Sequence, residues 1–273
     1  MTNIEKTNNI KISVIMVDGL YRPHFAVIDS LKRQSLNKND YEVLWVEYYD
    51  KVNPELIKKT ENEQNFKIIT LNKYGTYHSS YCFNHGINSA KGELLVIPDA
   101  DVLFDEDFLE KIRYEHQKNE QLVMYIFRLD EPVKPENSSF NLDLNNLKMN
   151  CELTNPSNYG GCLTVRKKWL LEINGYELDD VFRTGGDHAN GLDVYTRFKN
   201  SGKHIMWNPN LRIYHPWHPH QSGRQQAYSI QKILIDHRAK SLDVLPYKGI
   251  NPSLNREIPI LLQTKLDLEK NKI

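Results

Sequence analysis

Hydrophobic and polar residues alternate in blocks along the first part of the chain. Apolar runs rich in β-branched residues have the length of buried strands, and they lie at 12–17, 41–48, 66–71 and 93–98. Between them, segments 23–33 and 79–90 carry apolar residues at helical spacing. This β-α-β-α order predicts an α/β fold in which helices flank a central, mostly parallel sheet.

The pattern is less regular in the second half of the chain. It predicts helices at 105–118 and 224–239, strands at 121–129, 204–207 and 211–214, and a strand followed by a helix within 162–173. Gly185-Gly186-Asp187 opens a further helix that Asn200-Ser201-Gly202 closes. The polar, Asn-rich stretch 131–156 is long enough for a functional loop, and the Lys- and Asn-rich C-terminus is expected to fray.

Composition narrows the class of protein. Among 273 residues, 35 Lys and Arg balance 35 Asp and Glu, so nothing suggests a nucleic-acid partner. Three cysteines without CxxC spacing are typical of reduced thiols in the cytoplasm. The N-terminus is polar, and no window approaches the ~18 apolar residues of a membrane span. We expect a cytoplasmic protein, attached at most peripherally to the inner face of the membrane.

Two carboxylates, Asp99 and Asp101, follow the apolar run Leu94–Pro98 directly. Ligands of open α/β sheets bind at the carboxyl ends of the strands. One carboxylate there can hold a hard divalent cation that bridges two phosphates, while the other reaches a sugar hydroxyl. The alternative is a solvated turn, because paired acids are common where loops begin. Neither carboxylate is expected to be in the core.

Several segments together resemble a known family. They are Ile12–Val17, Asn84–Glu93, Asp99-Ala-Asp101, a Gly-Gly pair ahead of a helix, and the late Tyr214-His215. In this order they resemble family 2 glycosyltransferases of the GT-A fold, a nucleotide-binding α/β fold, over roughly residues 10 to 220. The resemblance implies inverting transfer of a sugar from a nucleotide-sugar, most often a UDP-sugar, to a glycan or lipid-linked acceptor hydroxyl, with Mn²⁺ or Mg²⁺.

The resemblance also implies a division of the chain. Residues 1–220 would form the glycosyltransferase domain, with a nucleotide-binding half at about 10–101 and an acceptor half at about 102–220. Residues 221–273 would be a C-terminal helical extension.

Binding roles follow from the matched positions. Asp101 matches the metal-ligating acid, Asp99 the acid that contacts the ribose or donor sugar, and His215 a late histidine that completes the metal site. Imidazole beside a carboxylate suits Mn²⁺. A histidine before proline can also be structural, but His215, His218 and His220 within six residues favour a site.

The nucleoside would meet the ends of the first two strands. Val17 and Asp18 match the first of these ends. Glu47 stands where the family usually has an acid that holds the base, and a neighbouring tyrosine could stack on the ring instead. Gly160 and Gly161 would let the backbone approach a bound sugar, or they serve a tight strand entry. Each strand-end acid could equally be a turn residue.

The catalytic base is the least defined role. Inverting transfer needs a carboxylate to take the acceptor proton. In the family an Asp of a Glu-Asp pair at a helix N-terminus, often after Gly-Gly, does this, and that pair is absent from the helix that follows Gly185-Gly186. Asp187 keeps the Gly-Gly-acid order at a helix N-terminus, where it could instead be a cap. Ungapped alignment puts Gly191 at the base position and Asp193 two residues later. Asp193 could instead form an i,i+4 pair with Arg197, which would add a few tenths of a kcal/mol to the helix. Asp187 is the first candidate and Asp193 the second.

Two other classes stay open. A sugar nucleotidyltransferase shares an α/β nucleotide fold, but the segment Val17–Arg22 lacks the Gly-rich, basic loop expected of one. A non-catalytic relative that binds a sugar nucleotide is the other alternative, because the Glu-Asp pair is missing.

Overall fold

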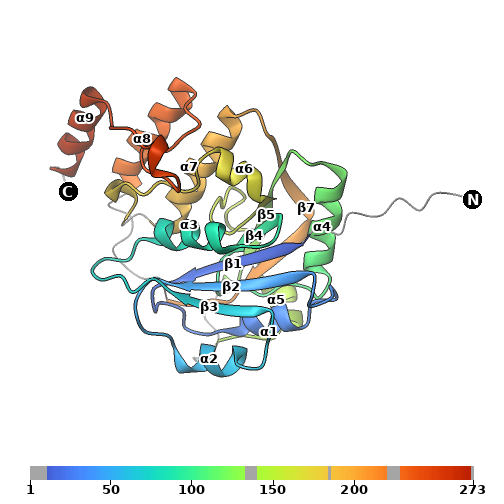
Figure 1. Cartoon of the computed structure of the whole chain (residues 1–273). Coiled ribbons are helices and arrows are strands. Elements are labelled where there is room, and N and C mark those ends of the chain that lie inside the picture. Colours follow the sequence, from blue (N-terminus) through green and yellow to red (C-terminus); the bar gives the residue numbers. More distant parts are fainter. Residues whose placement is uncertain (1–10, 133–139, 184–185, 220–227, 272–273) are drawn as a thin grey trace, which may run out of the picture.

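A seven-stranded mixed sheet forms the centre of the protein (Figure 1). The computed structural model describes residues 11–132, 140–183, 186–219 and 228–271. The strands are β1 (Ile12–Asp18), β2 (Tyr41–Glu47), β3 (Phe66–Thr70), β4 (Leu94–Pro98), β5 (Leu122–Asp130), β6 (Cys162–Arg166) and β7 (His204–His215), in the order β3-β2-β1-β4-β6-β5-β7. β6 is antiparallel to both of its neighbours, and the other pairs are parallel. The predicted α/β class is confirmed.

Helices cover both faces of the sheet (Figure 1). One face packs against α1 (Ala26–Lys32), α2 (Pro54–Thr60) and α4 (Phe108–Lys118), and the other against α3 (Ser79–Ser89), α6 (Lys167–Glu172) and α7 (Gly186–Asn200). The alternation of β1 explains this arrangement: Val14 and Met16 enter the first core, while Ile15 and Val17 enter the second. Two apolar layers therefore enclose the strands.

The carboxyl ends of six strands meet at one edge of the sheet, because only β6 runs the other way. Asp18, Glu47, Asp130 and His215 are the last residues of β1, β2, β5 and β7, and Asp99 directly follows β4. The reversed β6 begins at this same edge, after Gly160-Gly161. The topology thus gathers the candidate residues in one place.

Several elements differ from the expectations. β7 is one strand with a bulge, because Ile126 pairs with Asn208 but Phe127 pairs with Arg212. The gap between the two predicted short strands is this bulge, and Pro209 fits there because it has no N–H to donate. Helix α2 was not predicted, α5 (Leu144–Asn150) forms within the expected 131–156 loop, and α9 (Ile260–Lys270) occupies the end expected to fray.

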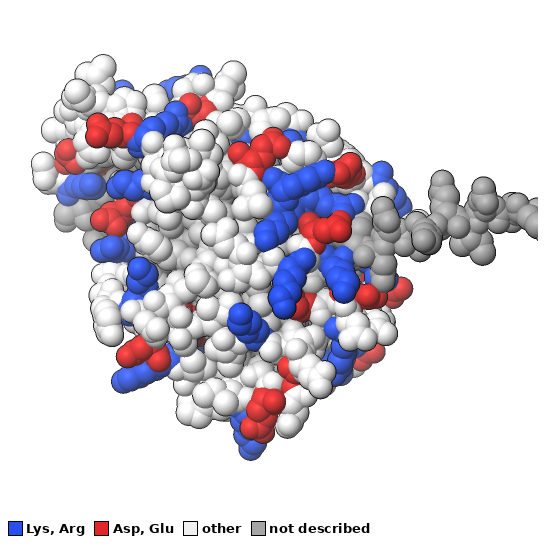
Figure 2. Space-filling model, viewed as in Figure 1, with Lys and Arg blue, Asp and Glu red and all other residues white. Residues whose placement is uncertain are grey.

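An outer layer, α8 (Tyr228–Ser241) and α9, packs beyond α7 through an apolar cluster of its own. The 3-10 turns η1 (Asp180–Phe182) and η2 (Pro252–Leu254) complete the described elements. Among the described residues, no helix has the length and apolar character needed to cross a membrane. Basic and acidic side chains lie next to one another on the face seen in Figure 2, so that face carries both signs of charge.

Candidate functional site

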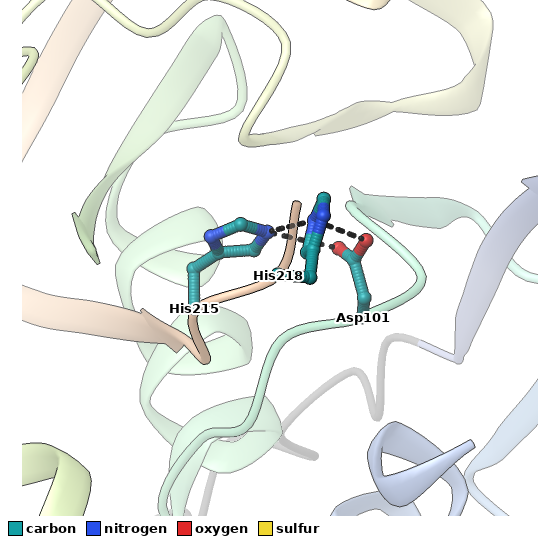
Figure 3. Close-up of side chains that lie close together, drawn as sticks. All are labelled: Asp101, His215 and His218. Atoms are coloured by element: carbon teal, nitrogen blue, oxygen red, sulfur yellow. Dashed lines mark hydrogen bonds and ion pairs between the residues drawn. The ribbon is translucent and has the colours of Figure 1, made fainter. Parts of the chain in front are cut away.

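Asp101, in the loop after β4, lies close to His215 and His218 at and beyond the end of β7 (Figure 3). Their candidate ligand atoms all lie within 4.8 Å of one another. The Nε2 atoms of His215 and His218 are 3.1 Å apart, and Asp101 oxygens lie 3.6 Å and 3.5 Å from them. Ligands at right angles around an ion at about 2.1 Å are about 3 Å apart, so the spacing suits one divalent cation.

Asp101 is buried, with 2% of its surface exposed, which corrects the expectation that it lies outside the core. Arg22 Nη1 donates a hydrogen bond to its Oδ2, while the buried Oδ1 accepts no hydrogen bond from the described residues. Burial works against ionisation, but the charge of Arg22 and the two histidines hold the pKa of Asp101 well below its ordinary value. A buried, charged oxygen facing two imidazoles fits a cation ligand.

His215 is held between two carboxylates. Its Nε2 faces Asp101, and its Nδ1 lies 3.1 Å from Asp130 Oδ1. Burial opposes a charge on the ring, yet the interactions with Asp101 and Asp130 outweigh it and raise the pKa of His215 to about 9. Without a bound cation, the ring is therefore protonated at neutral pH.

Asp99 is turned toward β5. Arg128 Nη1 donates to Asp99 Oδ2 at 2.8 Å, and Arg128 Nε lies 2.9 Å from Asp130 Oδ1. Burial opposes the charge of Arg128, but Asp99 and Asp130 raise its pKa. The backbone N–H of Asp99 donates to the carbonyl of Gly161 at 2.8 Å, which ties the loop before β6 to the end of β4.

Asp18 and Glu47 lie opposite each other at the ends of β1 and β2. Asp18 Oδ1 accepts hydrogen bonds from the N–H groups of Gly19 and Tyr21, and Glu47 Oε1 accepts one from Leu20. Leu20 has a φ of 62°, in the left-handed region that is strained for leucine. Such backbone strain is often found at functional sites. Burial and the nearby Asp18 raise the pKa of Glu47 to about 8, and burial also raises that of Asp18.

Tyrosine rings surround this loop. Tyr77 packs edge-on against Tyr21 and Tyr48, with ring centroids 5.4 Å apart in both pairs. Two tyrosines follow Glu47 in the sequence. Tyr48 is buried, so Tyr49 has the more exposed ring of the two, while Tyr21 is 40% exposed. Val17 is buried in the core, which leaves its backbone as the part that can meet a ligand.

A close backbone contact joins α7 to the Gly160-Gly161 loop. A Cβ at Gly191 would lie 2.3 Å from the carbonyl oxygen of Tyr159, so glycine is required at this approach. Asp187 lies in the first turn of α7, but its side chain is not among those that the structure describes. Gly185 and His220 lie outside the described residues.

Asp193 is fully enclosed, and it forms the i,i+4 pair with Arg197 that the alternative interpretation predicted. Arg197 Nε donates to its Oδ2 at 2.8 Å, and Arg238 of α8 donates to its Oδ1. Arg238 also pairs with Glu177, and all four side chains are at most 1% exposed. Burial works against ionisation, but the two arginines lower the pKa of Asp193.

Arg22, Arg128, Asp130 and His24 lie at or near the site but were not predicted from the sequence. Arg128 and Asp130 did carry a signal, because residues two apart at the end of an apolar strand share one side of the sheet. Arg22 carried none, since its contact with Asp101 depends on how the loop after β1 folds back. His24, also missed, is buried near the cluster, and burial lowers its pKa to about 4.

The comparison with protein families gives a match to "Glycosyl transferase family 2" over residues 26–173. This is more than half of the chain, which therefore belongs to glycosyl transferase family 2. The predicted family is confirmed. No curated protein sequence matches the chain.

Solved structures agree on the fold. TarS residues 1–349 of S. aureus superpose with a TM-score of 0.60 at 14% identity, covering 95% of this chain and 70% of that one. The same protein bound to UDP-GlcNAc gives 0.60 at 15% identity, over 83% and 65%. The mannosyltransferase PcManGT from Pyrobaculum calidifontis, in complex with GDP-Man and Mn²⁺, gives 0.55 at 17% identity, over 95% and 69%. The chain covers only 39% of a longer TarS structure.

Proposed function

We propose that this chain is a metal-dependent, inverting glycosyltransferase that uses a nucleotide-sugar, with UDP as the preferred nucleotide, and a glycan or lipid-linked acceptor. The observation that carries the proposal is the cluster of Asp101, His215 and His218 at the edge where the strands end. Membership of the family supports the reaction class. Neighbours bound to UDP-GlcNAc, and to GDP-Man with Mn²⁺, support the donor and the metal.

In this proposal Asp101, His215 and His218 hold Mn²⁺ or Mg²⁺. When bound, the cation neutralises the diphosphate that leaves with the nucleotide. Two imidazoles favour Mn²⁺. Asp99 accepts a hydrogen bond from a sugar or ribose hydroxyl, while Arg128 keeps its carboxylate oriented.

The nucleoside lies over the ends of β1 and β2. Asp18 and Glu47 shape the loop after β1, and the backbone at Val17 is the part that contacts the nucleoside. The donor sugar lies against the backbone of Gly160-Gly161, which has no side chain to obstruct it.

Asp187 is the proposed catalytic base. It would accept the acceptor hydroxyl's proton as the hydroxyl oxygen attacks the anomeric carbon. Its rival, Asp193, already has both oxygens bound to buried arginines, so it has no exposed lone pair for a substrate. The position of α7, pressed against the Gly160-Gly161 loop, supports this assignment.

A thermal-shift screen of UDP- and GDP-sugars, with and without Mn²⁺, tests the proposal. A ligand that binds only the native state raises stability by ~2.7 kcal/mol at a hundredfold excess over Kd. We expect a UDP-sugar with Mn²⁺ to stabilise the wild type and not Asp101→Asn. The matched control is Asp40→Asn, because Asp40 also pairs with an arginine, Arg113, but lies outside the site. An undiminished Mn²⁺ response in Asp101→Asn would remove the metal assignment.

Donor hydrolysis separates the alternatives. Donor binding without hydrolysis or transfer would indicate the non-catalytic relative. Formation of a nucleotide-sugar from a nucleoside triphosphate and a sugar phosphate would indicate a nucleotidyltransferase. Release of UDP from the donor, dependent on Asp101 and metal, is the result that we expect.

A further inference from the structure

Asp130 contacts His215 on the side of the ring that faces away from the cation cluster. Its Oδ1 lies 3.1 Å from His215 Nδ1, while His215 Nε2 faces Asp101 and His218. The two ring nitrogens therefore have separate partners. Histidines that ligate metals usually donate the other ring N–H to a carboxylate or carbonyl, which fixes the tautomer and the ring orientation.

The backbone fixes this contact. Asp130 and His215 are the last residues of β5 and β7 and stand opposite each other in the pairing. The N–H of Glu131 donates to the carbonyl of His215 at 3.0 Å. Asp130 and Glu152 also exchange backbone hydrogen bonds at 2.8 Å and 2.9 Å. The backbone of Asp130 is thus held from both sides, and that of His215 is tied to the end of β5.

Two further groups lie against the Asp130 carboxylate. Arg128 Nε lies 2.9 Å from Oδ1, and the Thr154 hydroxyl donates to Oδ2 at 2.5 Å. The side chain of Asp130 is 16% exposed and that of His215 is 14% exposed, so little water competes for the contact. The carboxylate is therefore oriented before any ligand arrives.

We infer that Asp130 is a positioning residue for the metal site: it accepts the Nδ1–H of His215 and so aims the Nε2 lone pair at a divalent cation shared with Asp101 and His218. This inference rests on the proposed function, because it assumes that the cluster binds a cation. Arg128 extends the same arrangement to Asp99, since one guanidinium contacts both carboxylates.

Calorimetry with Mn²⁺ alone tests the inference without any catalytic assay. Loss of an outer-shell partner costs about 10–100-fold in metal affinity. We expect that loss in Asp130→Ala and a smaller one in Asp130→Asn, because the amide oxygen still accepts from Nδ1–H. The matched control is Asp40→Ala, because Asp40 is similarly exposed (20%) and arginine-paired but contacts no described histidine. Its Mn²⁺ affinity should equal that of the wild type.

A spectroscopic readout covers the case in which Asp130→Ala fails to fold. In ¹⁵N-histidine-labelled protein loaded with Zn²⁺, we expect metal at Nε2 and a proton at Nδ1 of His215 in the wild type. In Asp130→Asn the Nδ1–H signal should shift and exchange faster with water. Unchanged Mn²⁺ affinity in Asp130→Ala, or His215 bound through Nδ1 in the wild type, would overturn the positioning role and leave the metal site standing. A wild type that binds neither ion would overturn both.

Discussion

At the scale of single residues, the charge of Asp101 is balanced by side chains from two distant segments. Arg22 follows β1, whereas His215 and His218 lie at and after the end of β7. A cation that binds here must displace the proton of His215, because a metal ligand needs its lone pair. Metal binding and deprotonation of His215 are thus coupled at this site.

The two histidines should distinguish Mn²⁺ from Mg²⁺. Imidazole is a softer ligand than carboxylate or water, so His215→Ala and His218→Ala should each weaken Mn²⁺ binding more than Mg²⁺ binding. Calorimetry with each ion measures this difference. His204→Ala is the control, because His204 begins β7 at the opposite edge of the sheet. Equal losses for both ions, or none, would give the histidines a structural role.

Glu47 predicts a pH-dependent stability. Its pKa in the folded protein, about 8, lies above the ordinary value of 4.5, so the native state retains this proton after the unfolded chain has lost it. Stability from this group is therefore complete below about pH 4.5 and is lost as the pH rises toward 8. Glu47→Gln has no proton to lose there, so its free energy of unfolding should fall less between pH 5 and pH 8.

Urea unfolding of both proteins at pH 5, 6.5 and 8 measures the effect. The difference between variant and wild type isolates Glu47 from the other titrating groups. Parallel pH profiles for the two proteins would show that Glu47 is ionised in the folded state at neutral pH.

The sequence anticipated several residues at strand ends, but it missed Asp130 at the end of β5 and Arg22, whose position depends on loop packing. Asp99 and Asp101 could be placed because they directly follow a buried strand, and His215 because of the family resemblance. The burial of Asp101 could not be anticipated, since it requires Arg22 to fold back from the loop after β1. The roles of these residues in binding and catalysis stay predictions.

At the scale of elements, helix α7 has two different neighbours. At Gly191 it packs against the backbone of Tyr159, and two residues later Asp193, with Arg197, is buried beneath α8. The i,i+4 spacing predicted the contact between Asp193 and Arg197. It could not predict that the contact is buried, because the covering helix α8 is distant in the sequence. The antiparallel direction of β6 was missed for a similar reason, since alternation within a strand does not encode its direction.

Substitutions in α7 should separate chemistry from stability. Asp187→Asn should keep donor and metal affinity yet lower kcat by ~10²-fold or more, the scale of lost general-base assistance. Asp193→Asn should instead lower the free energy of unfolding by about 3–5 kcal/mol, because two buried arginines lose a charged partner.

Transfer assays and urea unfolding of both variants provide the two measurements. A folded, stable Asp193→Asn protein without activity would move the base to Asp193. If neither substitution slows transfer, the base lies outside α7.

At the scale of the whole molecule, the C-terminal extension is part of the packed structure. Arg238 of α8 contacts Asp193 and Glu177, and Leu234 and Ile235 pack in one cluster with Phe182. The boundary predicted at residue 220 is thus crossed by buried ion pairs and apolar contacts.

Removal of the predicted extension, residues 221–273, should therefore destabilise the remaining chain. It would expose the apolar face of α7 and leave Asp193 and Glu177 without Arg238. We expect a lower Tm and aggregation, measured by calorimetry and light scattering against the full chain. A monomeric truncated protein with an unchanged Tm would make residues 1–220 an independent domain.

Because of the bulge in β7, the number of residues in one backbone segment decides which side chain faces Asp130 at the candidate metal site. If the pairing of Ile126 with Asn208 continued without interruption, Arg212 and not His215 would stand opposite Asp130. Because residues 209–211 are extra, the register of β7 shifts, and the imidazole of His215 lies opposite Asp130 in place of the guanidinium of Arg212. An insertion or deletion in this segment would therefore change the ligand set without substituting any ligand.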